Sequence, residues 1–85
     1  MNKQYWSEVK ADYDELEGFE PEGDIIKSIC VDAWKTGDPD EEGLVIAKVI
    51  LTKSGDSGVV YIDKLAMHDE KAQEIIQEVL RTIKE

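Results

Sequence analysis

Apolar residues recur at the spacing of one helical face near the end of the chain. They stand at i, i+3, i+4, i+7, i+8 and i+11, as Ala72, Ile75, Ile76, Val79, Leu80 and Ile83. This period predicts an amphipathic helix over residues 69–84. Acids in its first turn (Asp69, Glu70) and bases in its last turn (Arg81, Lys84) suit the helix dipole. The apolar face of such a helix has to pack on another element.

Three segments upstream have the alternation or the β-branched composition of strands. Residues 44–52 are rich in Val and Ile and are followed by a turn-forming stretch at residues 54–58. Residues 59–63 are the expected hairpin partner, and residues 25–35 alternate with period two. We therefore expect three antiparallel strands in a meander, with residues 36–42 joining the first two.

Near the start of the chain, four large residues stand at roughly helical spacing: Trp6, Val9, Tyr13 and Leu16. This spacing predicts a first helix over residues 2–16. Gly18, Pro21 and Gly23 then mark a loop. The predicted fold is a single α+β domain over residues 1–85, a three-stranded antiparallel β-meander with an N-terminal and a C-terminal helix (α-β-β-β-α).

The middle predicted strand carries apolar side chains on both faces. One face holds Val45, Ala47, Val49 and Leu51, and the other holds Leu44, Ile46 and Ile50, interrupted by Lys48. We expect the first set to pack on the C-terminal helix, through Ile76, Val79, Leu80 and Ile83. The second face is either covered by the N-terminal helix or left for a partner or a second copy of the chain. We favour the covered arrangement because small monomers rarely leave large apolar patches exposed.

Negative charge is concentrated in one short stretch of this 85-residue chain, whose net charge is −10. No Lys or Arg stands between Lys10 and Lys27, and this interval contains a first acidic run of seven carboxylates: Asp12, Asp14, Glu15, Glu17, Glu20, Glu22 and Asp24. A second acidic run follows with Asp38, Asp40, Glu41 and Glu42. Crowded like charges repel one another until a cationic partner neutralises them. Both runs are therefore our candidate partner-binding residues.

Trp34 joins this candidate set. Tryptophan is among the residue types most enriched at binding hot spots, and Trp34 stands shortly before the second acidic run. A core position and an interface position both remain open for it. Trp6 is expected to lie in the core.

Composition excludes several classes of partner and predicts the compartment. A sequence pI near 4.4 argues against direct binding to nucleic acid or to an anionic membrane surface, because both need clustered Lys and Arg. The apolar stretches are too short to span a bilayer, and the first residues lack the apolar core of a signal peptide. The single cysteine, Cys30, agrees with a reducing compartment. We expect a cytoplasmic protein.

We expect neither enzymatic activity nor a cofactor. Cys30 and His68 have no partners at a spacing that suggests a nucleophile, a base and an orienting group, and one Cys with one His does not make a zinc site. Asp38, Asp40 and Glu42 resemble the first half of a calcium loop, but its twelfth position falls on Val49 instead of a carboxylate. We therefore expect a solvated acidic loop that binds calcium weakly or not at all.

The leading functional hypothesis is a non-enzymatic module that binds a basic protein surface. A sharper form is an inhibitor that mimics nucleic acid and blocks a nuclease or nucleic-acid-binding protein, by analogy of composition with small acidic inhibitors of phages and mobile elements. The alternative is a homo-oligomeric scaffold, such as a homodimer, or a small-ligand-binding protein that uses the second sheet face and Trp34. The acidic runs equally fit a surface that only keeps the protein in solution.

Overall fold

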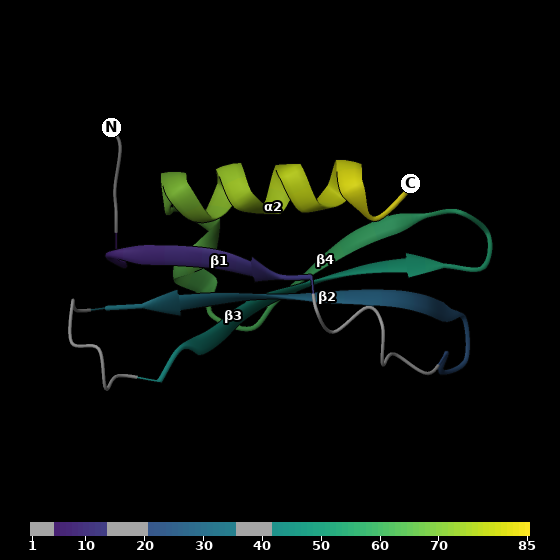
Figure 1. The fold of residues 1–85 in the computed structure, drawn as a ribbon, viewed down its shortest axis with the longest axis horizontal. Coiled ribbons are helices and arrows are strands. Elements are labelled where there is room, and N and C mark those ends of the chain that lie inside the picture. The colour runs from purple at the N-terminus through teal and green to yellow at the C-terminus, as the bar shows by residue number, and fades with distance from the viewer. Residues whose placement is uncertain (1–4, 14–20, 36–41) are drawn as a thin grey trace.

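A computed structural model of the protein describes residues 5–13, 21–35 and 42–85. Its strands form one antiparallel sheet in the spatial order β1-β2-β3-β4, where the strands are β1 (Glu8–Asp12), β2 (Ile25–Trp34), β3 (Leu44–Thr52) and β4 (Ser57–Tyr61). A short 3₁₀ helix, η1 (Lys64–Met67), follows β4 and leads into the helix α2 (Glu70–Thr82). Figure 1 shows α2 lying along one face of the sheet.

The predicted C-terminal helix is confirmed, with its apolar stripe facing the sheet. Ala72, Ile76, Val79 and Ile83 are fully buried, whereas Leu80 is only partly buried. Burial of each large apolar side chain stabilises the fold by about 1.5–3 kcal/mol. The last turn is held by the Lys27 ammonium, which donates hydrogen bonds to the carbonyls of Ile83 (3.4 Å) and Glu85 (2.8 Å).

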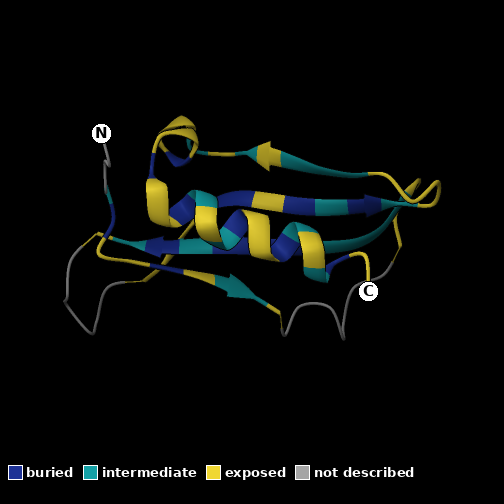
Figure 2. Ribbon diagram, turned by 90° about the horizontal axis from the view of Figure 1, so that it is seen from above, coloured by how far each residue is buried: buried dark blue, intermediate teal, exposed yellow. Residues whose placement is uncertain are grey.

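The core lies between α2 and the alternate residues of the sheet that point toward it. Figure 2 shows the buried positions of the helix above those of the central strands. Ile29 and Val31 of β2 and Val49 of β3 have no exposed surface. The predicted strands over residues 25–35, 44–52 and 59–63 are thus present, with small differences at their ends.

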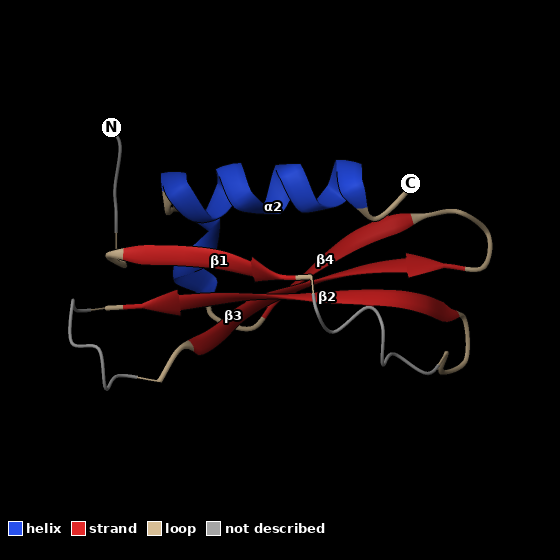
Figure 3. Ribbon diagram, viewed as in Figure 1, coloured by secondary structure: helices blue, strands red, loops and turns tan. Residues whose placement is uncertain are grey.

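The predicted N-terminal helix is wrong. Residues Glu8–Asp12 form the edge strand β1, which pairs antiparallel with β2 from Glu8 opposite Trp34 to Asp12 opposite Cys30. Val9 and Ala11 point toward the core, and the alternate charged residues Glu8, Lys10 and Asp12 point away. Because this segment pairs with β2, its core residues follow the two-residue period of a strand and not the period of a helix. The fold of the described residues is therefore β-β-β-β-α, with four strands and one α-helix instead of three strands between two helices (Figure 3).

Trp6 immediately precedes β1 and lies in the core, as expected. Its side chain is 2% exposed and packs edge-on against Tyr5, with ring centroids 6.1 Å apart and an interplanar angle of 66°. The remainder of the predicted first helix, residues 2–4 and 14–16, lies outside the described residues.

The predicted division of β3 into two faces is wrong at its start. The register passes from Val31 opposite Ala47 to Asp32 opposite Val45, so Ile46 is an extra residue in β3. Such a bulge turns two consecutive side chains to the same side of a sheet. Ile46 therefore joins the core at 1% exposure, and Val45, expected in the core, is 38% exposed on the opposite side.

The second face of the sheet is covered by no helix of the described residues, so the expected covering helix is absent there (Figure 3). By strand register and alternation, this open face carries Glu8, Lys10, Asp12, Ser28, Cys30, Asp32, Trp34, Val45, Lys48, Ile50 and Val60. Within the described ranges, no helix has the length and apolar character needed to cross a membrane.

Candidate functional site

The described carboxylates of the first acidic run lie on β1 and at the turn that opens β2. Asp12 ends β1 on the open face. Glu22 and Asp24 are exposed in a tight turn closed by two backbone hydrogen bonds between Glu22 and Ile25, of 3.0 and 3.1 Å. Gly23 permits this turn because its φ is +58°. The other members of this run lie outside the described residues: Asp14, Glu15, Glu17 and Glu20.

Glu42 is the member of the second acidic run that the structure describes, and it is exposed just before β3. Asp38, Asp40 and Glu41 lie outside the described residues, and most of the predicted calcium loop lies there with them. Its weak affinity for calcium stays a prediction.

The described acids that flank β2 lie at opposite ends of that strand, whereas Asp12 of the first run lies opposite Cys30, near its middle. The turn at Glu22 and Asp24 opens β2, whereas Glu42 precedes β3 beside the end of β2. A strand rises about 3.3 Å per residue, so the two ends of the 10-residue strand β2, where these acids stand, lie about 30 Å apart. The structure therefore does not gather the described acids into one cluster, and a partner that contacts both Asp24 and Glu42 has to span the length of β2.

The described acids are not neutralised within the described part of the molecule. No described cation lies within ion-pair distance of Asp12, Glu22, Asp24 or Glu42. An ion pair does join Lys10 and Glu8 at 3.1 Å, but both side chains are exposed, and such a pair contributes about 0–1 kcal/mol. Glu22, Asp24 and Glu42 are thus exposed with their charge available to a partner, and Asp12 is half-buried.

Trp34 is half-buried at the end of β2, and its indole ring lies against the backbone of Gly43. A methyl group at position 43 would stand 2.7 Å from the ring atoms Cε2 and Cζ2, which is too close for van der Waals contact. The carbonyl of Trp34 accepts hydrogen bonds from the backbone N–H (2.8 Å) and the hydroxyl (3.0 Å) of Ser7. The residue is therefore partly structural and still presents part of its surface on the open face.

Asp69 is a fully buried carboxylate with a structural role that the charge pattern of the helix did not predict. One oxygen, Oδ1, accepts from the Ala72 N–H at 2.8 Å and caps α2, while Oδ2 accepts from the Tyr5 N–H at 2.6 Å. An Asp immediately before an apolar helical repeat signals the cap. The bond to Tyr5 joins residues 64 positions apart and has no local signal.

Cys30 and His68, the residues considered as a nucleophile and a base, differ in their burial. Cys30 is buried at 8% exposure on the central strand β2. His68 is exposed after η1, where its backbone N–H donates to the Leu65 carbonyl. No group of three or more potential metal ligands occurs among the described residues.

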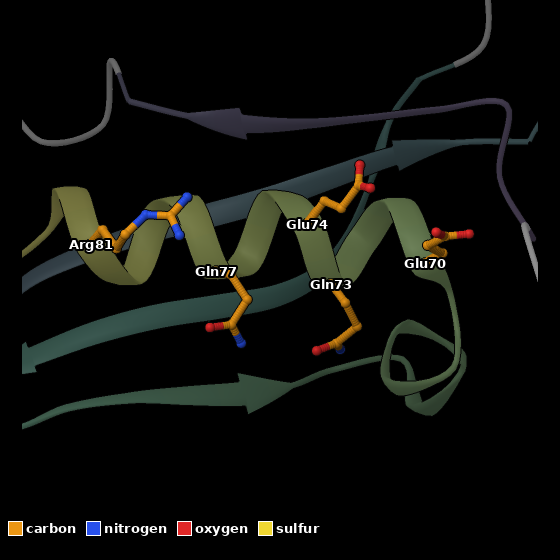
Figure 4. Close-up of a pocket in the computed structure, with 5 residues that line it drawn as sticks. All are labelled: Glu70, Gln73, Glu74, Gln77 and Arg81. Carbon is orange, nitrogen blue, oxygen red and sulfur yellow. The ribbon is translucent and has the colours of Figure 1, made fainter. Parts of the chain in front are cut away.

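A shallow hollow of about 440 Å³ lies along α2. It is lined by Glu70, Gln73, Glu74, Gln77 and Arg81, and Figure 4 shows that all five side chains project from this one helix. Ligand sites usually enclose most of a bound molecule with side chains from several elements. A polar stripe of a single helix does not provide this enclosure.

No family model, curated protein or solved structure matches this chain.

Proposed function

We propose that this protein is a small non-enzymatic binding module that docks its acidic surface on a basic face of another protein. The supporting observation is that the described carboxylates of both acidic runs have no described cation within ion-pair distance. Repulsion among such charges is relieved when Lys and Arg of a partner approach them, and this attraction also accelerates association. The proposed binding residues remain Asp12, Asp14, Glu15, Glu17, Glu20, Glu22, Asp24, Trp34, Asp38, Asp40, Glu41 and Glu42.

The separation of Glu22 and Asp24 from Glu42 along β2 supports the sharper form of this proposal, mimicry of nucleic acid. Carboxylates about 30 Å apart correspond to the length of about nine base pairs at 3.4 Å per step. A basic groove that holds a duplex of this length has cations at a matching separation. The partner class is then a nuclease or another nucleic-acid-binding protein, and occupation of its groove inhibits it.

The test is capture from a lysate of the native host with two variants of equal charge. The first neutralises four acids of the first run: Glu17→Gln, Glu20→Gln, Glu22→Gln and Asp24→Asn. The matched control neutralises four acids on or after α2: Glu70→Gln, Glu74→Gln, Glu78→Gln and Glu85→Gln. Both have a net charge of −6 instead of −10, so they differ only in where the charge is removed.

We expect the wild type and the control to retain a protein rich in Lys and Arg at about 50 mM salt and to release it at about 500 mM, where the screening length is only a few Å. The first variant should lose it. Under the sharper proposal, nucleic acid competes with the wild type for the retained protein. Equal retention by the first variant, or no basic protein in the wild-type capture, would contradict the proposal.

A second candidate function is favoured by one specific observation. Among the described residues, α2 covers one face of the sheet, and the open face carries Trp34, Val45 and Val60. This arrangement suits a homo-oligomeric scaffold or a small-ligand-binding protein. Light scattering tests the scaffold, because a scaffold keeps one assembly size on dilution, whereas docking through the acidic runs requires no self-association.

A further inference from the structure

Most of the exposed large apolar residues of the described chain gather in one corner of the molecule. They are Leu44, Val45, Val60, Ile62, Leu65 and Met67, each 38–57% exposed. The start of β3, the end of β4 and η1 meet here, since Ala47 pairs with Tyr61 and the Ile46 carbonyl accepts the N–H groups of Ile62 and Asp63. Leu44 lies opposite Ala33 of the core face and Val45 lies opposite Asp32 of the open face, so the set lies on both sides of the sheet. Single exposed apolar residues are ordinary, but several close together indicate an interaction region. We call this set the apolar corner.

The apolar corner continues into an unprotected edge strand. β4 is the last strand of the sheet, and no described strand pairs with its outer side. Its sequence, Ser-Gly-Val-Val-Tyr, contains neither a charged residue nor a proline. Monomeric proteins usually block such edges with charges, prolines or bulges, because an open edge offers its unpaired N–H and C=O groups to another strand.

The charge around β4 permits a second copy to approach. Residues 43–67 carry two acids and three bases, in a chain whose total is −10. Each end of β4 carries one acid and one base, Lys53 and Asp56 before it and Asp63 and Lys64 after it. Antiparallel pairing of two copies sets one end of β4 beside the other end of its partner, so each base meets an acid and no net charge accumulates.

We propose that a second copy of this chain pairs antiparallel along the outer edge of β4 and extends the sheet across a two-fold axis. Pairing satisfies the outward backbone groups of β4 and removes Val60 and Ile62 of both copies from water. The contact is isologous and closes at two copies. The surface is distinct from the acidic runs, so this inference goes beyond the proposed function and does not depend on it.

The test is sedimentation equilibrium between about 5 and 500 µM, a range that covers weak to moderate homodimers. The mass of the wild type should rise with concentration from 9.6 kDa toward twice that value. Val60→Lys should weaken dimerisation at least about tenfold, because the two-fold axis brings two added charges together. Val60 is 50% exposed, so the lysine reaches water in the monomer and the fold should persist, as circular dichroism will show.

Tyr13→Lys is the matched control, because Tyr13 is an exposed residue after the opposite edge strand and the charge change is the same. It should dimerise like the wild type, whereas Ile62→Lys should behave like Val60→Lys. Amide hydrogen exchange should also slow in β4, and not in β1, as concentration rises. A wild type that stays at 9.6 kDa, equal weakening by the Tyr13 and Val60 variants, or growth past the dimer would overturn the inference. Each of these results leaves the acidic-docking test unaffected.

Discussion

β1 and β4 occupy equivalent places at the two edges of one sheet, yet they present different chemistry. β1 alternates core residues with Glu8, Lys10 and Asp12, whereas β4 has no charged residue and adjoins the apolar corner. Charges along an edge oppose the addition of another strand. The first acidic run begins in β1, so the charges that block pairing there are continuous with the surface proposed to bind a basic partner. The two proposals thus assign electrostatic recognition to one part of the sheet and apolar recognition to the opposite edge.

The two edges also differ in how the helix holds them. The Asp69 carboxylate fixes the chain that enters β1, through the Tyr5 N–H. On the other side, the Gln73 amide donates to the Tyr61 hydroxyl of β4 (3.1 Å) and to the Ala66 carbonyl of η1 (2.9 Å). A buried carboxylate therefore anchors one edge and a partly buried amide anchors the other.

Loss of the shared core should have the largest effect, because α2 holds both edges. Ile76 has no exposed surface, so Ile76→Ala should lower the free energy of unfolding by about 2–5 kcal/mol, as measured by urea titration. Leu80→Ala, at a partly buried position, serves as the control and should cost clearly less. Equal losses at the two positions would show that the helix packs with a different face.

Removal of the capping carboxylates Asp69 and Asp63 compares how much each contributes to stability at its own edge of the sheet. Asp69→Ala deletes a helix cap and leaves the Tyr5 N–H without its acceptor, so we expect a loss of about 2–4 kcal/mol. Asp63→Ala deletes the cap of η1 beside β4, where the bond to the Leu65 N–H is exposed, and should cost about 0.5–1 kcal/mol. Urea titration measures both losses. A larger loss of unfolding free energy for Asp63→Ala than for Asp69→Ala would contradict the anchoring role of Asp69.

Two glycine substitutions, one beside Trp34 and one in β4, test local packing and have a smaller expected effect. Gly43→Ala forces the Trp34 ring to shift and should cost about 1–3 kcal/mol. Gly58→Ala in β4 meets no atom within 4 Å, so its effect on unfolding free energy should lie within about 0.5 kcal/mol of zero or be slightly stabilising. The indole resonance of Trp34 should move in the first variant alone, and an unmoved resonance would show that the ring does not rest on Gly43.

The elements with strong local patterns could be predicted from the sequence. The C-terminal helix has a long apolar period with suitable charges at its ends, and residues 44–52 have a β-branched run followed by a turn. The N-terminal strand was missed because four residues at helical spacing outweighed the shorter alternation of residues 8–12. This alternation becomes decisive only when β2 provides a pairing partner, which is a tertiary effect.

The candidate site could be predicted only in part. The acidic runs are visible in the charge pattern, but the placement of Asp24 and Glu42 at opposite ends of β2 depends on the antiparallel course of β2 and β3. The exposure of Val45 depends on the bulge at Ile46, and no residue of β3 predicts this bulge. The apolar corner was missed for the same reason, since it assembles from segments that meet only in the folded sheet.

The most direct test of the separation between the two edges is the salt dependence of self-association. Sedimentation equilibrium of the wild type at about 50 and about 500 mM NaCl should show a tighter dimer at high salt, because screening weakens repulsion between two chains of charge −10 and leaves the apolar contact intact. Partner capture by the acidic runs should show the opposite sign. A dimer that weakens as salt rises would show that carboxylates and cations form the self-contact, and would contradict the assignment of apolar recognition to β4.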